Sequence, residues 1–242
     1  MIFEAEPGRK KIKPIVTYSI ILINVIVYVF QNLDFGTYLF MVNNYGLRPA
    51  EIMSGQNLIT LLSSMFLHAG IYEGYYGLLH IFMNMYILFI FGDDAEAVFG
   101  GPLFLTFYLF CGVIAGLFHA AITVLFLPGM ANIPTIGASG AIFGVMAAYA
   151  LAFPKRRLMM LMYYYPVQLP ALAAVAFLVA IEVMYSIFAI TFGLSVSIAN
   201  TAHVGGFIAG AAFTFLFKLT GRGPWKEKKE LPDEYYFRVE EY

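Results

Sequence analysis

The chain has 242 residues, of which 61% are hydrophobic and only 12% are charged, and its mean hydropathy is +0.78. A soluble domain of this length carries about a quarter charged residues, so the composition excludes a water-soluble globule. The formal net charge of -1 gives no field that would attract nucleic acid. The single cysteine, Cys111, excludes both a disulfide framework and a thiolate metal site.

Six apolar segments along the chain are each near the length that crosses a bilayer as a helix. The first follows a basic cluster, as a secretory signal would, but no small-residue cleavage site comes after it, so we interpret it as a retained membrane helix. The sequence therefore predicts an all-α, polytopic membrane protein. Its six predicted helices are residues 15–30, 78–91, 102–127, 136–153, 170–191 and 198–217.

Charge divides the chain into three parts, which are a basic N-terminal segment (1–14), a membrane domain (15–217) and a charged C-terminal tail (218–242). We expect the tail to be a short, partly disordered extension, because it is too polar to bury a core. The longest connection, residues 33–77, mixes apolar residues with glycines and tyrosines, and we expect it to lie partly in the membrane interface.

Basic residues determine the expected orientation, because Lys and Arg beside membrane helices favour the cytoplasmic side. Of the 14 basic residues, all except Arg48 flank one end of the predicted bundle. We therefore expect cytoplasmic termini in a protein of the cell membrane, with the second, fourth and sixth helices starting at the outer face. Asp93, Asp94 and Glu96 fall in the predicted connection between the second and third helices.

Few polar residues lie within the predicted helices, and each is a candidate for function because polar groups in the bilayer are costly. His80 begins the second helix, and Asn84 follows one turn later on the same face. Ser139 lies at the start of the fourth helix and His203 near the start of the sixth. These four residues share one depth at the outer side. A hydroxyl, an imidazole and further hydrogen-bond donors at one place suit acyl transfer.

Glycines beside these residues indicate that two helices touch. Gly140 and Gly144 form one small-xxx-small pattern, and Gly206 and Gly210 form a second one directly after the histidine. Such patterns let the backbones of membrane helices approach each other, so we expect the fourth and sixth helices to be in contact.

Each polar residue also has a purely structural interpretation. A serine in a membrane helix usually bonds to its own helix, and lone histidines and asparagines usually join packed helices. The joint occurrence of four such residues at one depth favours chemistry. His68 and His119 are not accompanied by other polar residues at the same depth, and we interpret them as structural. Glu182, in the fifth helix, would be protonated, bonded to a neighbouring helix or facing water, and it is given no catalytic role.

Three motifs in the chain resemble the signature motifs of the rhomboid intramembrane serine proteases. They are G-A-S-G at residues 137–140, H-x-x-x-N at residues 80–84 and A-H-x-x-G-x-x-x-G at residues 202–210. The resemblance covers all six predicted helices in the family's order and corresponds to its minimal six-helix form. It implies hydrolysis of peptide bonds in or near transmembrane segments of other membrane proteins, with no cofactor or metal ion.

By this resemblance, Ser139 is the nucleophile and His203 is the general base of a dyad without an acidic third member. The side chains of His80 and Asn84, with the backbone N–H of Ser139, would form the oxyanion hole. Gly137 belongs to the nucleophile motif. Phe143 stands where the family often has a tyrosine, and its ring would pack on the imidazole without supplying a hydroxyl.

Two further positions depart from the family pattern. A Trp-Arg pair common in the first outer loop is replaced here by Leu47 and Arg48, so that only the arginine carries over, as a residue that structures the loop. The segment 70–79 is longer than in familiar bacterial members, and we expect its polar and aromatic residues to reshape the entrance to the site. These residues are Tyr72, Glu73, Tyr75 and Tyr76.

Other intramembrane protease chemistries do not fit the sequence. None of the 4 histidines begins the zinc motif H-E-x-x-H, and every aspartate lies outside the predicted helices. The alternatives from other classes are a catalytically silent rhomboid-like protein that binds membrane helices, and a transporter. Retention of both Ser139 and His203 disfavours the first. The absence of paired halves and of helices broken in mid-membrane disfavours the second.

Overall fold

The computed structural model of the protein describes residues 13–162, 165–192 and 199–223. Most of the predicted basic segment (1–14) and most of the predicted tail (218–242) lie outside the described residues. Part of the connection between the last two helices lies outside them as well.

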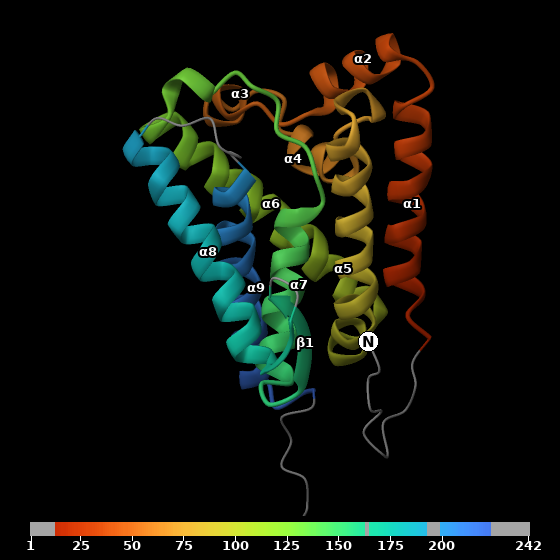
Figure 1. Cartoon of the computed structure of the whole chain (residues 1–242), viewed down its shortest axis with the longest axis vertical. Coiled ribbons are helices and arrows are strands. Elements are labelled where there is room, and N and C mark those ends of the chain that lie inside the picture. Colours follow the sequence, from red (N-terminus) through yellow and green to blue (C-terminus); the bar gives the residue numbers. More distant parts are fainter. Residues whose placement is uncertain (1–12, 163–164, 193–198, 224–242) are drawn as a thin grey trace, which may run out of the picture.

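Six apolar helices form a bundle in the described part of the chain (Figure 1). Four of them are long and apolar enough to cross a membrane, whereas α1 and α7 are shorter. The predicted all-α, polytopic bundle is therefore confirmed, and the chain is an integral membrane protein. The six helices are α1 (Ile15–Gln31), α5 (Tyr75–Phe99), α6 (Gly101–Phe126), α7 (Ser139–Ala152), α8 (Ala171–Phe192) and α9 (Ala199–Leu219).

Helix α7 is the most enclosed element of the bundle. Nearly all of its residues from Gly140 to Ala150 are buried. With 14 residues it spans about 21 Å at 1.5 Å per residue, which is less than the thickness of the bilayer core. The chain descends from the end of α6 to reach the start of α7 (Figure 1). Its first residue, Ser139, is consequently placed inside the bundle.

The long connection between α1 and α5 contains short helices, gathered at one end of the bundle (Figure 1). Asp34 begins the first of them by accepting hydrogen bonds from the backbone N–H (3.0 Å) and the hydroxyl (2.6 Å) of Thr37. These bonds lower the pKa of Asp34 below its usual value. The short helices are α2 (Phe35–Tyr45), α3 (Pro49–Met53), α4 (Thr60–Ser63) and the 3₁₀ turns η1 (Ser64–Phe66) and η2 (Ile71–Glu73). A further turn, η3 (Pro128–Met130), follows α6.

An antiparallel hairpin at the other end of the bundle was not predicted. Strand β1 (Arg157–Met162) pairs with β2 (Tyr165–Pro170), with Arg157 opposite Pro170. The strands connect α7 to α8 on the side of the bundle where α1 begins (Figure 1). Most of this hairpin falls in the connection between the predicted helices 136–153 and 170–191.

The predicted second helix was too short at both ends. Helix α5 starts at Tyr75, before His80, and continues to Phe99. Asp93, Asp94 and Glu96 therefore lie in a helix, and the prediction that every aspartate lies outside the helices was wrong. Asp94 accepts a hydrogen bond from Arg156 at 2.5 Å. This ion pair stabilises the carboxylate of Asp94 within the helix.

Glu96 is buried and holds the start of α1. Its carboxylate accepts hydrogen bonds from the backbone N–H groups of Val16 (3.1 Å) and Thr17 (2.8 Å) and from the Thr17 hydroxyl (2.8 Å). The first N–H groups of a helix have no partner within it, and the helix dipole favours a negative charge there. Glu96 thus joins α5 to α1.

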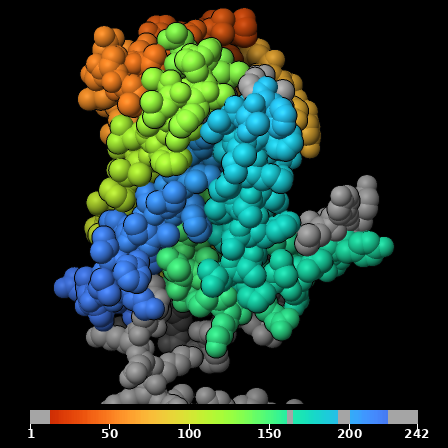
Figure 2. Space-filling model, turned by 90° about the vertical axis from the view of Figure 1, so that its left-hand side faces the viewer, coloured from red at the N-terminus to blue at the C-terminus, as the bar shows by residue number. Residues whose placement is uncertain are grey.

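Helix α8 lies at the outside of the bundle beside α9 (Figures 1 and 2). Only four of its 22 residues have buried side chains, and these are Ala171, Ala174, Val175 and Ala189. Large apolar side chains such as Phe177, Tyr185 and Phe188 are exposed, as expected for a surface that faces lipid.

Candidate active site

Ser139 and His203 lie side by side at the contact between α7 and α9. Ser139 is the first residue of α7, and His203 is in the first turns of α9. The Nε2 atom of His203 lies 2.7 Å from the Ser139 hydroxyl oxygen, so this nitrogen can accept the hydroxyl proton. Phe143 stacks on the imidazole with ring centroids 4.4 Å apart and planes 8° from parallel. The serine thus contacts one edge of the ring, and the phenylalanine covers one face.

Glycines allow α7 and α9 to approach at their backbones. A methyl group at Gly206 would collide with the carbonyl oxygen of Gly140. A methyl group at Gly210 would lie 2.5 Å from the Cα atom of Gly144. The two small-residue patterns therefore face each other, and a larger residue on either helix would move His203 away from Ser139.

The turn before Ser139 requires a glycine. Gly137 has a φ of +132°, which L side chains rarely adopt, and a Cβ atom there would lie 2.9 Å from Nε2 of His80. The following residue, Ala138, is the N-cap of α7, and no side chain caps this helix end. The backbone N–H of Ser139 is among the helix-terminal groups that lack an intrahelical partner, so it is available to a developing oxyanion.

His80 and Asn84 supply two further donors beside Ser139. The backbone N–H of Ala69 donates to Nδ1 of His80 at 3.2 Å, so the neutral ring carries its proton on Nε2, the atom close to Gly137. Asn84 donates one amide hydrogen to the carbonyl of His80 at 2.7 Å and keeps a second. Two side-chain N–H groups are thus available near the hydroxyl.

A cavity of about 460 Å³ brings the four predicted residues Ser139, His203, His80 and Asn84 together, since all of them line it. This volume is in the range of small-ligand sites. The rest of the lining is mostly apolar and includes Leu79, Met83, Ile87, Ile142 and Phe143. The cavity combines apolar walls with a few convergent polar groups, which is the usual character of a binding site.

The segment predicted to reshape the entrance contributes Glu73 and Tyr76 to the lining of this cavity. The Tyr38 hydroxyl, from α2, donates a hydrogen bond to the Glu73 carboxylate. Burial, and then this hydrogen bond, raises the pKa of Tyr38 to about 12, so the phenol stays a donor at neutral pH. Helix α2 is thereby tied to the lining of the cavity.

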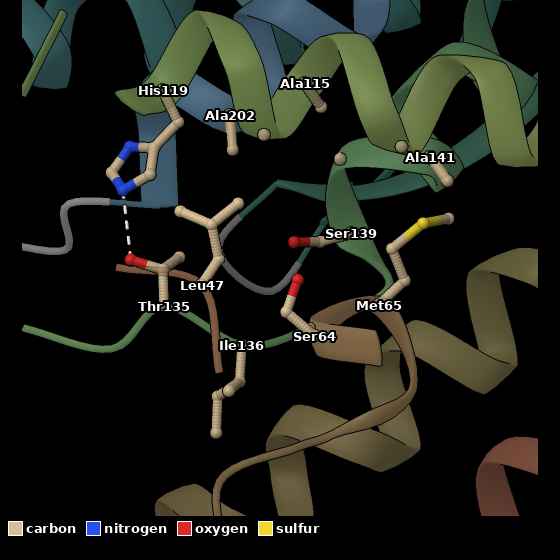
Figure 3. A pocket seen from close by; sticks show the side chains of 14 residues that line it. Leu47, Ser64, Met65, Ala115, His119, Thr135, Ile136, Ser139, Ala141 and Ala202 are labelled. Atoms are coloured by element: carbon tan, nitrogen blue, oxygen red, sulfur yellow. Dashed lines mark hydrogen bonds between the residues drawn. The ribbon is translucent and has the colours of Figure 1, made fainter. Parts of the chain in front are cut away.

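A second, smaller cavity also reaches Ser139 (Figure 3). Its volume of about 30 Å³ is enough for about one water molecule. His119 lies in its wall and hydrogen-bonds to Thr135 (3.0 Å) and Thr201 (2.7 Å). These contacts join α6 to α9 and to the segment before α7, which is a structural role for this histidine.

The connection between α1 and α5 makes two further contacts, one within itself and one with His80. Arg48 hydrogen-bonds to the side chain of Asn43 at 2.8 Å and so structures the loop. His68 is fully buried, with its ring centroid 5.1 Å from that of His80. Burial lowers the pKa of His68 to about 3, so the ring is neutral where it supports His80. Sequence reasoning missed this contact, because a loop separates the two histidines and no regular spacing relates them.

Comparison with known proteins shows which proteins this chain is similar to. The family model of the Rhomboid domain matches residues 55–219, about two thirds of the chain. RHOMBOID-like protein 6, mitochondrial, of Arabidopsis thaliana is 29% identical over 177 residues, which are 73% of this chain and 49% of the relative. Rhomboid protein 1, mitochondrial, of Saccharomyces cerevisiae is 30% identical over 159 residues, covering 64% of this chain and 40% of the relative.

A third relative carries a different name. Inactive RHOMBOID-like protein 8 of Arabidopsis thaliana is 29% identical over 166 residues, or 68% of this chain and 39% of the relative. The chain thus spans half or less of the length of these relatives. The mitochondrial names do not fit the cell membrane expected from the sequence. The extent of the domain match shows that the chain belongs to the rhomboid family.

Proposed function

We propose that this protein is an intramembrane serine protease that hydrolyses peptide bonds in or near transmembrane segments of other membrane proteins. The observation that carries the proposal is the 2.7 Å contact between Ser139 and His203. This pair lines the cavity that also holds His80 and Asn84. A nucleophile within reach of a base, with donors beside both, is the arrangement that acyl transfer needs.

In the proposed reaction, the Ser139 oxygen attacks the substrate carbonyl while Nε2 of His203 takes the hydroxyl proton. The resulting oxyanion is bound by the backbone N–H of Ser139 and by side-chain N–H groups of His80 and Asn84. His203 then gives its proton to the leaving amine. A water molecule, activated by the same nitrogen, hydrolyses the acyl-serine and restores the hydroxyl.

The proposed substrates are membrane proteins held in the same bilayer. A continuous helix hides its carbonyl groups in hydrogen bonds, so a segment must unwind before Ser139 can attack it. Residues with low helix propensity, such as Gly, Ser or Pro, would favour unwinding near the cleavage site. The resemblance to rhomboid proteases also implies a preference for a small residue before the cleaved bond.

The competing proposal is a silent rhomboid-like protein that binds membrane helices, and one of the relatives is named as inactive. The presence and mutual position of Ser139 and His203 favour a protease. A transporter would need polar groups along a path through the bundle, whereas these residues gather at one cavity.

Labelling with a fluorophosphonate separates these functions, because only an activated serine attacks the probe. The purified protein in detergent micelles should form an adduct, and peptide mass spectrometry should locate it on Ser139. The Ser139→Ala variant is the matched control and should remain unlabelled. A folded wild-type protein that forms no adduct on Ser139 would support the binding or transport alternative.

A further inference from the structure

Glu182, to which the sequence alone assigns no catalytic role, lies against His203, the proposed general base. The Glu182 carboxylate, from the middle of α8, is 3.0 Å from the Nδ1 atom of His203. The other ring nitrogen, Nε2, faces the Ser139 hydroxyl at 2.7 Å. The imidazole of His203 therefore lies between a carboxylate and a hydroxyl, one at each nitrogen.

The surroundings of Glu182 argue against an incidental contact between its carboxylate and His203. Helix α8 exposes most of its side chains to lipid, and a carboxylate in such a helix is costly unless it is paired. The Glu182 side chain is only 20% exposed, and its partner across the contact is 16% exposed. Among the described residues, the Glu182 oxygen that faces Nδ1 has no hydrogen-bond partner. Nδ1 of His203 is likewise without a hydrogen-bond partner among these residues, so each of the two atoms has the other as its nearest polar group in this contact.

We propose that Glu182 is a positioning residue that converts the Ser139–His203 pair into a serine–histidine–glutamate triad. The inference rests on the proposed function, and it differs from the dyad without an acidic member that the family resemblance implies. The carboxylate favours the tautomer of His203 with its proton on Nδ1. Nε2 is then the unprotonated atom, and it points at the hydroxyl that it must deprotonate.

The charge of Glu182 also acts during the reaction. When Ser139 attacks, its proton moves to Nε2, so His203 becomes a cation while the substrate carbonyl becomes an oxyanion. Glu182 keeps its negative charge and takes no proton. A carboxylate already in place stabilises the imidazolium more than the neutral ring, so its effect falls on the transition state more than on substrate binding. Phe143, stacked on the ring face, supplies no such charge.

The test uses the full chain in liposomes with a transmembrane substrate, comparing Glu182→Gln and Glu182→Asp with the wild-type protein. Loss of the orienting acid in soluble triads lowers kcat by about 10⁴-fold, and a partly exposed acid should have a smaller effect. We expect Glu182→Gln to lower kcat about a hundredfold or more, with KM within about twofold of wild type. Glu182→Asp keeps the charge and should recover kcat to within about tenfold of wild type.

Ser186→Ala is the matched control, because Ser186 lies one turn along α8 and its hydroxyl donates a hydrogen bond to the backbone carbonyl of Glu182 at 2.8 Å. It should retain wild-type kcat. The rate of fluorophosphonate labelling of Ser139 gives a second readout that needs no substrate, and it should fall in parallel with kcat for Glu182→Gln.

Three outcomes would overturn the triad. Unchanged kcat in Glu182→Gln would show that the carboxylate does not assist His203. Equal losses in the Gln and Asp variants, accompanied by a lower melting temperature, would assign Glu182 to helix packing. A wild-type protein that neither cleaves nor is labelled would overturn the protease and the triad together, which distinguishes failure of the proposed function from failure of this inference.

Discussion

His203 depends on side chains from two other helices. Ser139 and Phe143 come from α7, whereas Glu182 comes from α8. These first two contacts were predicted from the sequence, because Ser139, Phe143 and His203 lie in or beside motifs that resemble the rhomboid signatures. The sequence could not predict the third, since one carboxyl in an apolar helix is equally consistent with protonation or with a different partner. The same limit applies to His68, whose contact with His80 arises from the path of a loop.

Replacing Asn84 by alanine tests the oxyanion hole. Asn84→Ala should lower kcat by about 10²- to 10³-fold, because removing one oxyanion donor typically costs about 2.7–4 kcal/mol when other donors remain. Asn44→Ala is the matched control. Asn44, in α2, makes the same kind of bond to its own helix, from its side-chain amide to the Phe40 carbonyl at 2.7 Å, but lies away from the cavity. If Asn84→Ala lowered only the melting temperature, Asn84 would be a packing residue.

At the scale of elements, the contact between α7 and α9 sets the distance between nucleophile and base. Gly206→Ala should force the helices apart, because the added methyl group meets the Gly140 carbonyl oxygen. Overpacking of this kind typically costs about 1–3 kcal/mol, and activity should fall more steeply than stability as His203 leaves Ser139. Melting temperature and cleavage rate, measured together, check this expectation.

The control for that substitution is Gly129→Ala, since nothing lies within 4 Å of a Cβ atom at Gly129. It should leave both melting temperature and activity near wild type. A Gly206→Ala variant with wild-type activity would show that the catalytic pair tolerates a wider helix separation than the structure indicates.

The start of α1 offers a second test at this scale. Glu96→Gln should destabilise the protein by about 1–3 kcal/mol, because a neutral amide accepts hydrogen bonds from the three donors of α1 less well than a carboxylate does. The free energy of unfolding in mixed micelles measures the effect. Glu51→Gln is the control and should change it little, because the Glu51 carboxylate accepts a solvent-exposed hydrogen bond from Asn57. Equal stability of Glu96→Gln and wild type would mean that α1 is held by apolar packing alone.

Apolar length and motif spacing were sufficient to predict the six bundle helices, whereas helix ends depended on tertiary contacts. The acidic end of α5 looked like a loop, because the sequence does not show which groups pair with its carboxylates. In the structure, Arg156 pairs with Asp94, and N–H groups of α1 pair with Glu96. The β1–β2 hairpin was missed for the converse reason. Its apolar residues have no periodicity that separates a strand from a short helical segment.

For the whole molecule, the distribution of basic residues predicts that the site lies toward the face of the membrane opposite to the two ends of the chain. In a Cys111→Ala background, a cysteine at Gly129 should react with an impermeant thiol reagent added on that face, because thirteen of the 14 basic residues favour the other side. A cysteine at Lys155 should be protected until the membrane is opened. The reverse pattern would place the Ser139 end of α7 on the side of the termini.

The most direct test of the account is cleavage of a transmembrane substrate by the purified protein in liposomes, compared with its Ser139→Ala variant. The account predicts that the wild-type protein cuts the substrate within or beside its membrane segment. It also predicts that Ser139→Ala has no activity while keeping the wild-type melting temperature, because the hydroxyl lies beside His203 as the proposed nucleophile. Equal cleavage by the folded variant would contradict the assignment of Ser139 and, with it, the proposed mechanism.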